Sequence, residues 1–486
     1  MNSPDQDTRT EQREIDASAK WPLLAFFASA VLWLLAGGVL QLAANLQLHR
    51  PDFLADCVFT THGRLSAAAE NALVYGWGMN AAFAFSLWLM CRLSASTLRH
   101  GGWLFVAAKF WNLGVTLGVL GILGGYSTSF ELLEMPRFVT LILLAAYALI
   151  GAWSVTTFSI RNTENVFASQ WYLLGAAFWF PWLYAVAQVM LFKSPVRGVL
   201  QPVVNAWYVH GLYGLWFIPM ALAAAYYFLP KILGRPIASY YLAPLAFWWL
   251  ALTTAFAGGS RLIGAPVPVW ISTVGAVANY LLLVPVVIVV LNLFGTLAGR
   301  YGTLGGSVTL RFVFLSIVSF VVASALNLGL SMRGVAEVVQ FTLIPGLRDW
   351  VVFYACFSTA MFGAAYFILP RLTEREWRSP ALVKMHFSAT AVGVVLLVAG
   401  MLFAGWKQGV MLNDKEVPFA AITQMLSGWL ALRSVVFGLL LLGHLAFAIN
   451  FGWIVCPLRS AGATPAHFRN PPPLGLAKDP AAEGHA

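Results

Sequence analysis

The stretch YYLAPLAFWWLALTTAFAGGSR, residues 240–261, decides the class of fold. Residues 240–260 carry no Asp, Glu, Lys or Arg, and Arg261 follows directly. About 20 apolar residues in an α-helix are enough to cross the hydrocarbon core of a bilayer. The stretch therefore predicts a membrane-spanning helix that ends in a small Gly-Gly-Ser turn and a charge.

Apolar runs of this length recur along the whole chain. The 486 residues are 60% hydrophobic and only 10% charged, whereas soluble domains are about 25% charged. Because hydrocarbon offers the backbone no hydrogen-bond partner, the expected fold is an all-α, polytopic bundle of transmembrane helices. We predict twelve spans, near residues 21–45, 66–91, 103–124, 138–157, 168–192, 204–229, 240–260, 267–297, 312–330, 349–370, 385–405 and 424–456.

The membrane domain is expected to occupy residues 21–457, between two different ends. Residues 1–20 form a polar tail, and residues 458–486 are rich in Pro, Ala and Gly and are expected to be disordered. Basic residues are more numerous in the segments on the side of the termini, which predicts that both termini are cytoplasmic in a bacterial-type inner membrane. The net charge of +10 is attributed to this topology and to lipid headgroups. Nucleic-acid binding is not expected, because no soluble segment of the sequence carries a stripe of basic residues.

Ionisable residues inside apolar spans are costly and therefore mark candidate functional positions. Haem and copper sites in a helical bundle need several inward-facing imidazoles. We assign His386 and most other histidines to loops, tails or the edges of spans. The four cysteines are scattered and no Cys-x-x-Cys pair occurs, so thiolate metal sites and covalently attached haem are not expected. The ionisable residues within spans are Glu70, Lys109, His210, Arg261, Arg348, Asp349, Arg433 and His444.

Several blocks of sequence, in order, resemble the catalytic subunit I of haem–copper oxidases, and of the cbb-type cytochrome c oxidases in particular. They include GRLSAAAENALVYGWGMN (63–80), AWYVHGLYGLWF (206–217), YYFLPKILGRPIASYYLAPLAFWWL (226–250) and LRSVVFGLLLLGHLAFAIN (432–450). Residues 256–270 are similar to the family segment that carries two adjacent copper-binding histidines. Because the blocks keep their order and internal spacing, the resemblance implies a bundle of the subunit I type.

The resemblance also locates the positions at which the family binds its metals. The haem-ligand positions fall on Ala69, Arg348 and Trp350, and the copper-ligand positions on His210, Ser260 and Arg261. Only His210 keeps a ligand residue, because alanine, tryptophan and protonated arginine offer iron or copper no donor. We therefore expect no haem, no copper and no oxygen reduction. If this interpretation is wrong, b-type haem and copper are the cofactors that the resemblance implies.

The space vacated by missing cofactors must be filled, because bundles do not keep large voids. We expect Trp350 to fill the low-spin haem position, and Arg261 and Arg348 to project toward the former metal centre. A buried guanidinium needs an anionic or polar partner. Alternatives to a buried network are an anion or quinone-headgroup pocket and simple anchoring at the interface. The candidate network consists of Glu70, Arg261, Arg348, Asp349 and Arg433.

The leading hypothesis for function is a cytochrome c oxidase subunit I-like protein that is catalytically inactive by itself. It would anchor or scaffold a respiratory or other redox complex in the lipid bilayer and hold a partner such as a membrane-bound cytochrome c subunit. Three alternatives remain open on the same bundle: an active terminal oxidase or nitric oxide reductase, a transporter or proton channel, and a quinone-binding module.

Overall fold

The computed structural model describes the backbone of residues 4–456 and the side chains from Thr10 onward. Within these residues, twelve helical segments are long and apolar enough to cross a membrane, which confirms the predicted number and order of spans. The C-terminal tail, expected to be disordered from residue 458, lies outside the described residues.

Six of the twelve spans are single helices, and the other six contain two or three elements. In chain order the elements are α1 (Pro4–Gln47), η1 (Val58–Thr60), α2 (His62–Asn71), η2 (Ala72–Gly78), α3 (Met79–Leu93), α4 (Gly101–Leu123), α5 (Val139–Ser159), α6 (Ala168–Gln188), η3 (Val189–Lys193), α7 (Leu200–Gly211), η4 (Leu212–Phe217), α8 (Ile218–Leu233), α9 (Leu242–Ala257), η5 (Gly258–Leu262), α10 (Val269–Leu281), α11 (Leu283–Leu297), η6 (Tyr301–Gly306), α12 (Val308–Ser331), α13 (Arg333–Val339), α14 (Ile344–Trp350), η7 (Val351–Ser358), α15 (Thr359–Thr373), α16 (Pro380–Asn413) and α17 (Phe419–Val455).

The first helix begins at Pro4, well before the predicted start of the first span at residue 21. A buried aspartate, Asp16, fixes this early part of α1 to the end of α3: its carboxylate accepts hydrogen bonds from Trp88 Nε1 at 3.0 Å and from Arg92 Nη2 at 2.7 Å. Pairing removes much of the cost of burying the charge. The segment expected to be a polar tail therefore continues the first span as helix from Pro4 onward.

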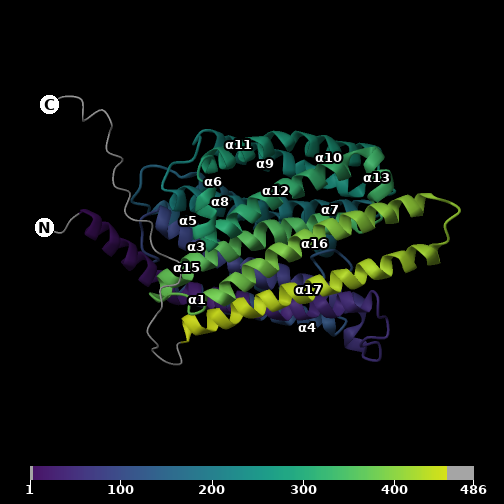
Figure 1. Ribbon diagram of the computed structural model, residues 1–486, viewed down its shortest axis with the longest axis horizontal. Helices are drawn as coiled ribbons and strands as arrows, with labels where there is room; N and C mark the ends of the chain where they lie inside the picture. Colours follow the sequence, from purple (N-terminus) through teal and green to yellow (C-terminus); the bar gives the residue numbers. More distant parts are fainter. Residues whose placement is uncertain (1–3, 457–486) are drawn as a thin grey trace.

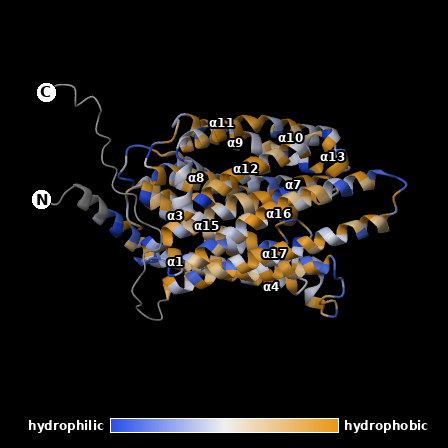
Figure 2. Ribbon diagram, viewed as in Figure 1, coloured by the Kyte–Doolittle hydropathy of each residue, from blue (hydrophilic) through white to orange (hydrophobic). Residues whose placement is uncertain are grey.

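Three spans form the centre of the bundle and the other nine surround them. In the second, sixth and tenth spans, 94%, 83% and 100% of the most apolar window is buried, against 33–50% in the others. The ribbon of the outer helices is largely coloured as hydrophobic (Figure 2), and large hydrophobic side chains are exposed along these helices, as expected for helices that face lipid. The inner spans therefore supply the core in which polar residues have to find protein partners.

Each of the three inner spans contains a stretch of π-helix: η2, η4 and η7. Such widened turns are rare and are frequently found at functional sites. Each begins one to three residues after Ala69, His210 or Trp350, positions that the family resemblance connects with metal binding. Apolar periodicity did not predict these stretches, because it does not distinguish a π turn from an α turn.

The last two helices, α16 and α17, form an antiparallel pair that reaches past the rest of the bundle (Figure 1). We call this end, opposite the start of α1 and the end of α17, the far face. The span predicted at residues 385–405 is much longer in the structure, because polar contacts hold its last turns. Leu343 N donates to Gln408 Oε1 at 3.1 Å, and Asn413 Nδ2 donates to the Glu337 carbonyl at 3.3 Å.

Candidate functional site

The turn at the end of the seventh span packs directly on α10. A Cβ atom on Gly259 would lie 2.3 Å from the Ile271 carbonyl oxygen, and one on Gly275 would lie 2.2 Å from Ser260 N. Only glycine allows the two backbones to approach this closely. The small residues of the turn therefore fix the position from which Arg261 extends.

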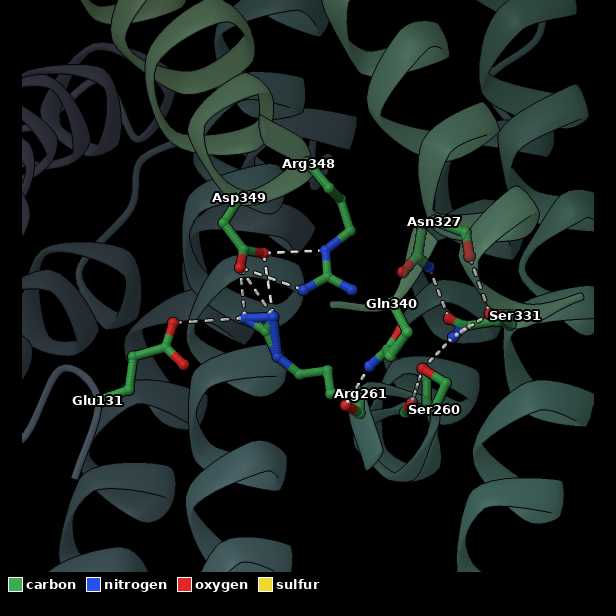
Figure 3. Close-up of polar contacts among 10 residues, drawn as sticks. Glu131, Ser260, Arg261, Asn327, Ser331, Gln340, Arg348 and Asp349 are labelled. Carbon is green, nitrogen blue, oxygen red and sulfur yellow. Dashed lines mark hydrogen bonds and ion pairs between the residues drawn. The ribbon is translucent and has the colours of Figure 1, made fainter. Parts of the chain in front are cut away.

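Two arginines bind one aspartate at this place (Figure 3). Arg261 Nη2 donates to Asp349 Oδ2 at 2.8 Å, and Arg261 Nη1 lies 2.9 and 3.1 Å from the two carboxylate oxygens. Arg348 Nε and Nη2 donate to the same carboxylate at 3.0 and 3.1 Å. Adjacent positions on a helix point about 100° apart, but the long Arg348 side chain folds back to reach its neighbour. We call these three residues the ion-pair cluster.

The cluster is shielded from solvent and is electrically balanced by a fourth residue. The side chains of Arg261, Arg348 and Asp349 are 9%, 8% and 17% exposed. Two cations and one anion leave an excess positive charge, and Glu131 Oε1 lies 3.8 Å from Arg261 Nη2. Asn205 fixes the loop that carries Glu131 through hydrogen bonds to its backbone N–H and carbonyl. Sequence reasoning missed Glu131 because it lies in a loop outside the apolar spans.

Ser260, the neighbour of Arg261, belongs to a separate amide and hydroxyl network. Its Oγ donates to the Ala257 carbonyl at 2.8 Å and accepts a hydrogen bond from Asn279 Nδ2 at 2.6 Å. Asn279 also donates to Ser331 Oγ at 2.9 Å, and its Oδ1 accepts from Asn327 Nδ2 at 2.6 Å. The Ser260 hydroxyl is therefore already engaged on both sides.

The remaining predicted positions lie in different surroundings. Ala69 is fully buried in α2. Trp350 stacks on Tyr354, with ring centroids 4.9 Å apart and planes at 21°, and meets Phe437 edge-on at 6.3 Å. His210 lines a cavity beside the ion-pair cluster. The positions that the resemblance predicts as haem ligands thus hold a methyl group, an aromatic stack and a paired guanidinium.

Glu70 and Arg433 do not join the ion-pair cluster by direct contact. They interact with each other only at longer range, without an ion pair or hydrogen bond between them. The Arg433 guanidinium lies over the Phe437 ring, 5.6 Å from its centroid. Of the five residues in the predicted network, the structure therefore brings together Arg261, Arg348 and Asp349.

Two histidines meet in the core, and one of them contradicts a prediction. His386 was expected at the edge of a span, but α16 begins at Pro380, so this residue is fully buried. Its Nδ1 lies 2.9 Å from the Tyr366 hydroxyl, and His444 Nε2 lies 2.7 Å from the Tyr354 hydroxyl. Within residues 4–456, no three His, Cys, Asp or Glu residues form a group that could hold a metal ion.

A second carboxyl group of the far face is held outside the spans. Glu134 lies in the loop before α5, and its Oε2 accepts a hydrogen bond from Asn71 Nδ2 at 2.8 Å. Partial burial raises the pKa of Glu134 to about 7, while the hydrogen bond from Asn71 opposes this shift. The group therefore titrates near neutral pH.

The chain is similar to subunits of known oxidases. Residues 22–440 match the family model described as Cytochrome C and Quinol oxidase polypeptide I. The Cbb3-type cytochrome c oxidase subunit CcoN1 of Stutzerimonas stutzeri is 25% identical, over 80% of this chain and 84% of that protein. A cytochrome c oxidase subunit 1 homolog of Azorhizobium caulinodans is 26% identical, over 87% of this chain and 79% of that protein. A heme-copper terminal oxidase dimer solved by cryo-electron microscopy has a TM-score of 0.63 and 14% identity, over 94% of this chain and 86% of that chain.

These similarities confirm the resemblance to haem–copper oxidase subunit I, and they correct the prediction that the chain has no cofactor. That prediction is contradicted because subunits I of this family bind haem and copper. Among the six positions that the resemblance predicts as ligands, His210 is the only imidazole, so these residues do not fit haem and copper in the predicted arrangement. Arg261 is protonated and already bound to Asp349, and a guanidinium does not ligate metal. Haem or copper in this chain would need ligands from other positions.

Replacing Asp349 should destabilise the protein more than replacing either arginine. Asp349→Asn leaves two buried guanidiniums without their anion, and breaking such a pair costs about 3–5 kcal/mol. Arg261→Met leaves Asp349 paired with Arg348 and should cost about 1–3 kcal/mol. The midpoint of thermal unfolding in detergent measures both effects. Lys415→Met, in the exposed loop before α17, serves as a control with an expected change below about 0.5 kcal/mol. An Asp349→Asn variant as stable as this control would show that the cluster is not stabilising.

Stability should depend on pH through Glu134. Its pKa is raised in the folded protein, so between about pH 4.5 and 7 the folded state binds more protons than the unfolded state. The resulting stability is complete at low pH and is lost as the pH rises through about 7. Glu134→Gln should flatten this part of the profile of unfolding midpoint against pH, whereas Glu416→Gln, in an exposed loop, should leave the slope unchanged. Equal slopes in all three proteins would contradict the assignment.

Proposed function

The chain belongs to the cytochrome c and quinol oxidase polypeptide I family, and on this premise we propose that it is a non-catalytic, subunit I-type protein that anchors a redox complex in the membrane. The observation that carries the proposal is the ion-pair cluster, in which Arg261 and Arg348 stand at positions where the family resemblance expects metal ligands. Twelve spans make the chain a multi-pass membrane protein. A bundle of the family type, with arginines at predicted metal-ligand positions, fits an anchoring role.

The chemistry of the cluster supports this role. A protonated guanidinium has no lone pair for a metal and repels a cation. Both Arg261 and Arg348 are fixed by Asp349, so neither can move aside without leaving a buried charge unpaired. Chemistry that needs a metal at this place is therefore unfavourable, while the backbone frame around it is kept.

The cluster also joins parts of the chain that a partner would meet together at the far face. Arg261 lies in the last turn of the seventh span, Asp349 lies in the first two turns of the tenth, and Glu131 lies in the loop between α4 and α5. Cross-linking these segments gives a rigid surface, and rigid surfaces lose less conformational entropy on binding. The relatives are named as subunits of cytochrome c oxidases. By analogy, the partner that we propose is a membrane-bound cytochrome c or another redox subunit.

Purification from native membranes tests the anchoring role. The affinity-tagged chain should co-purify with a cytochrome c or other redox subunit in constant stoichiometry, as measured by mass spectrometry. That partner should be depleted in membranes of a strain that lacks the chain, because it loses its anchor. An unrelated twelve-helix membrane protein with the same tag controls for non-specific retention. Oxygen uptake by the purified chain alone, driven by reduced cytochrome c, would overturn the non-catalytic role.

Two native cysteines test the proposed orientation, in which both termini are cytoplasmic. Cys57 is exposed at the far face and Cys456 is exposed at the opposite end, whereas Cys91 and Cys356 are buried. A hydrogen bond from Thr60 lowers the pKa of Cys57, which favours its reactive thiolate. An impermeant maleimide should label Cys57 in cells with a permeable outer membrane, and Cys456 only after lysis. Cys57→Ser and Cys456→Ser identify the two signals, and the reverse pattern would invert the topology.

A further inference from the structure

A cavity of about 220 Å³ lies beside the ion-pair cluster, between the sixth, seventh, eighth, ninth and tenth spans. Most of its wall is apolar and includes Leu250 and Phe320. One end is polar, where His210, Asn327 and Arg348 face the space. Apolar walls with a few placed polar groups are typical of sites for small ligands.

Three polar groups of this cavity have no hydrogen-bond partner among residues 4–456. They are the His210 imidazole, the Tyr213 hydroxyl and the side-chain oxygen of Asn327, whose amide nitrogen is bound to Asn279. Polar groups inside proteins are almost always hydrogen-bonded. Tyr213 and one nitrogen of His210 can donate to an oxygen atom, and Asn327 Oδ1 can accept from a hydroxyl. The cavity is therefore equipped for a ligand with oxygen substituents.

The charges around the cavity favour a neutral ligand. Arg261 and Arg348 are balanced by Asp349 and Glu131 through the contacts described above. An added anion or cation would leave one charge without a counter-ion in a place with little solvent, which is costly. A free carboxylate, a phosphate or a metal cation is thus a poor match.

The volume of the cavity and the position of its opening restrict the choice of ligand further. A cavity of about 150 Å³ in an apolar protein core accepts benzene, so this larger space suits one substituted six-membered ring. Leu283 on α11 and Val321 on α12 line the cavity and are also 50% and 36% exposed. Its opening therefore lies between these two helices, on the side of the bundle that faces lipid.

We propose that this cavity binds the ring of a neutral, membrane-soluble quinone or quinol. The ring oxygens accept hydrogen bonds from Tyr213 and His210, and in the quinol a ring hydroxyl can also donate to Asn327 Oδ1. The apolar tail leaves between α11 and α12 into the bilayer. No electron transfer is required of the chain by this proposal. It also does not depend on the anchoring role, since a quinone site can exist with or without a bound redox partner.

Binding is tested with the full-length protein in detergent and a short-tailed ubiquinone as the probe. The midpoint of thermal unfolding should rise with ubiquinone concentration, because a ligand that binds only the folded state stabilises it. Ala323→Phe fills the cavity from α12 and should raise Kd at least 100-fold. Val284→Phe adds the same kind of bulk on the lipid side of α11, outside the cavity, and should leave Kd unchanged.

A conservative variant keeps the test sharp if Ala323→Phe does not fold. Tyr213→Phe removes one hydroxyl and should raise Kd about fivefold, as expected for one lost hydrogen bond. Mass spectrometry of an organic extract of protein purified from native membranes should find a quinone near one per chain. No thermal shift with the wild-type protein, equal Kd values in Ala323→Phe and wild type, or an acyl chain or haem in place of the quinone would each overturn the proposal.

Discussion

The carboxylate of Asp349, held by two guanidinium groups, is the interaction on which the arrangement of the far face depends. A charge in the interior of a bundle is tolerated only when its partner is fixed in place. The turn before Arg261 packs closely against α10, where Gly259 has no room for a side chain, and this packing fixes the arginine that pairs with Asp349. Pairing these charges therefore holds together helices from distant parts of the sequence.

The ion-pair cluster and the neighbouring amide network both give buried polar groups their partners, but by different interactions. Asn279 joins Ser260, Ser331 and Asn327 through hydrogen bonds between neutral groups, so its atoms need no counter-charge. The arginines need one and obtain it from Asp349 and Glu131. A largely apolar cavity lies beside these two networks. Packing here is therefore constrained by the hydrogen bonds and ion pairs that the polar side chains require, as well as by volume.

The sequence predicted the spans well and the site only in part. Helix number and order follow from apolar runs, since hydrocarbon permits few other structures. Arg261, Arg348 and Asp349 could be proposed as partners because charges within spans are rare. Glu131 could not, because a loop glutamate in sequence looks like any solvated residue. The position of His386 was predicted wrongly because α16 begins at Pro380, and its first turns carry polar residues that the apolar pattern excludes from the span. The family resemblance predicts where metal ligands would lie, but the absence of cofactors inferred from those positions disagrees with the family.

The length of the α16–α17 pair has a mechanical consequence. At about 1.5 Å per residue, the 34 residues of α16 span about 51 Å, well beyond a hydrocarbon core of about 30 Å. Two antiparallel helices braced by α13 at their outer end resist bending more than a loop of equal reach. The projecting end of this helix pair is a stiff post, that is, a rigid protrusion at one edge of the far face. A large extramembrane domain cannot lie flat over that edge and must approach from the other side, so the post sets the direction of approach.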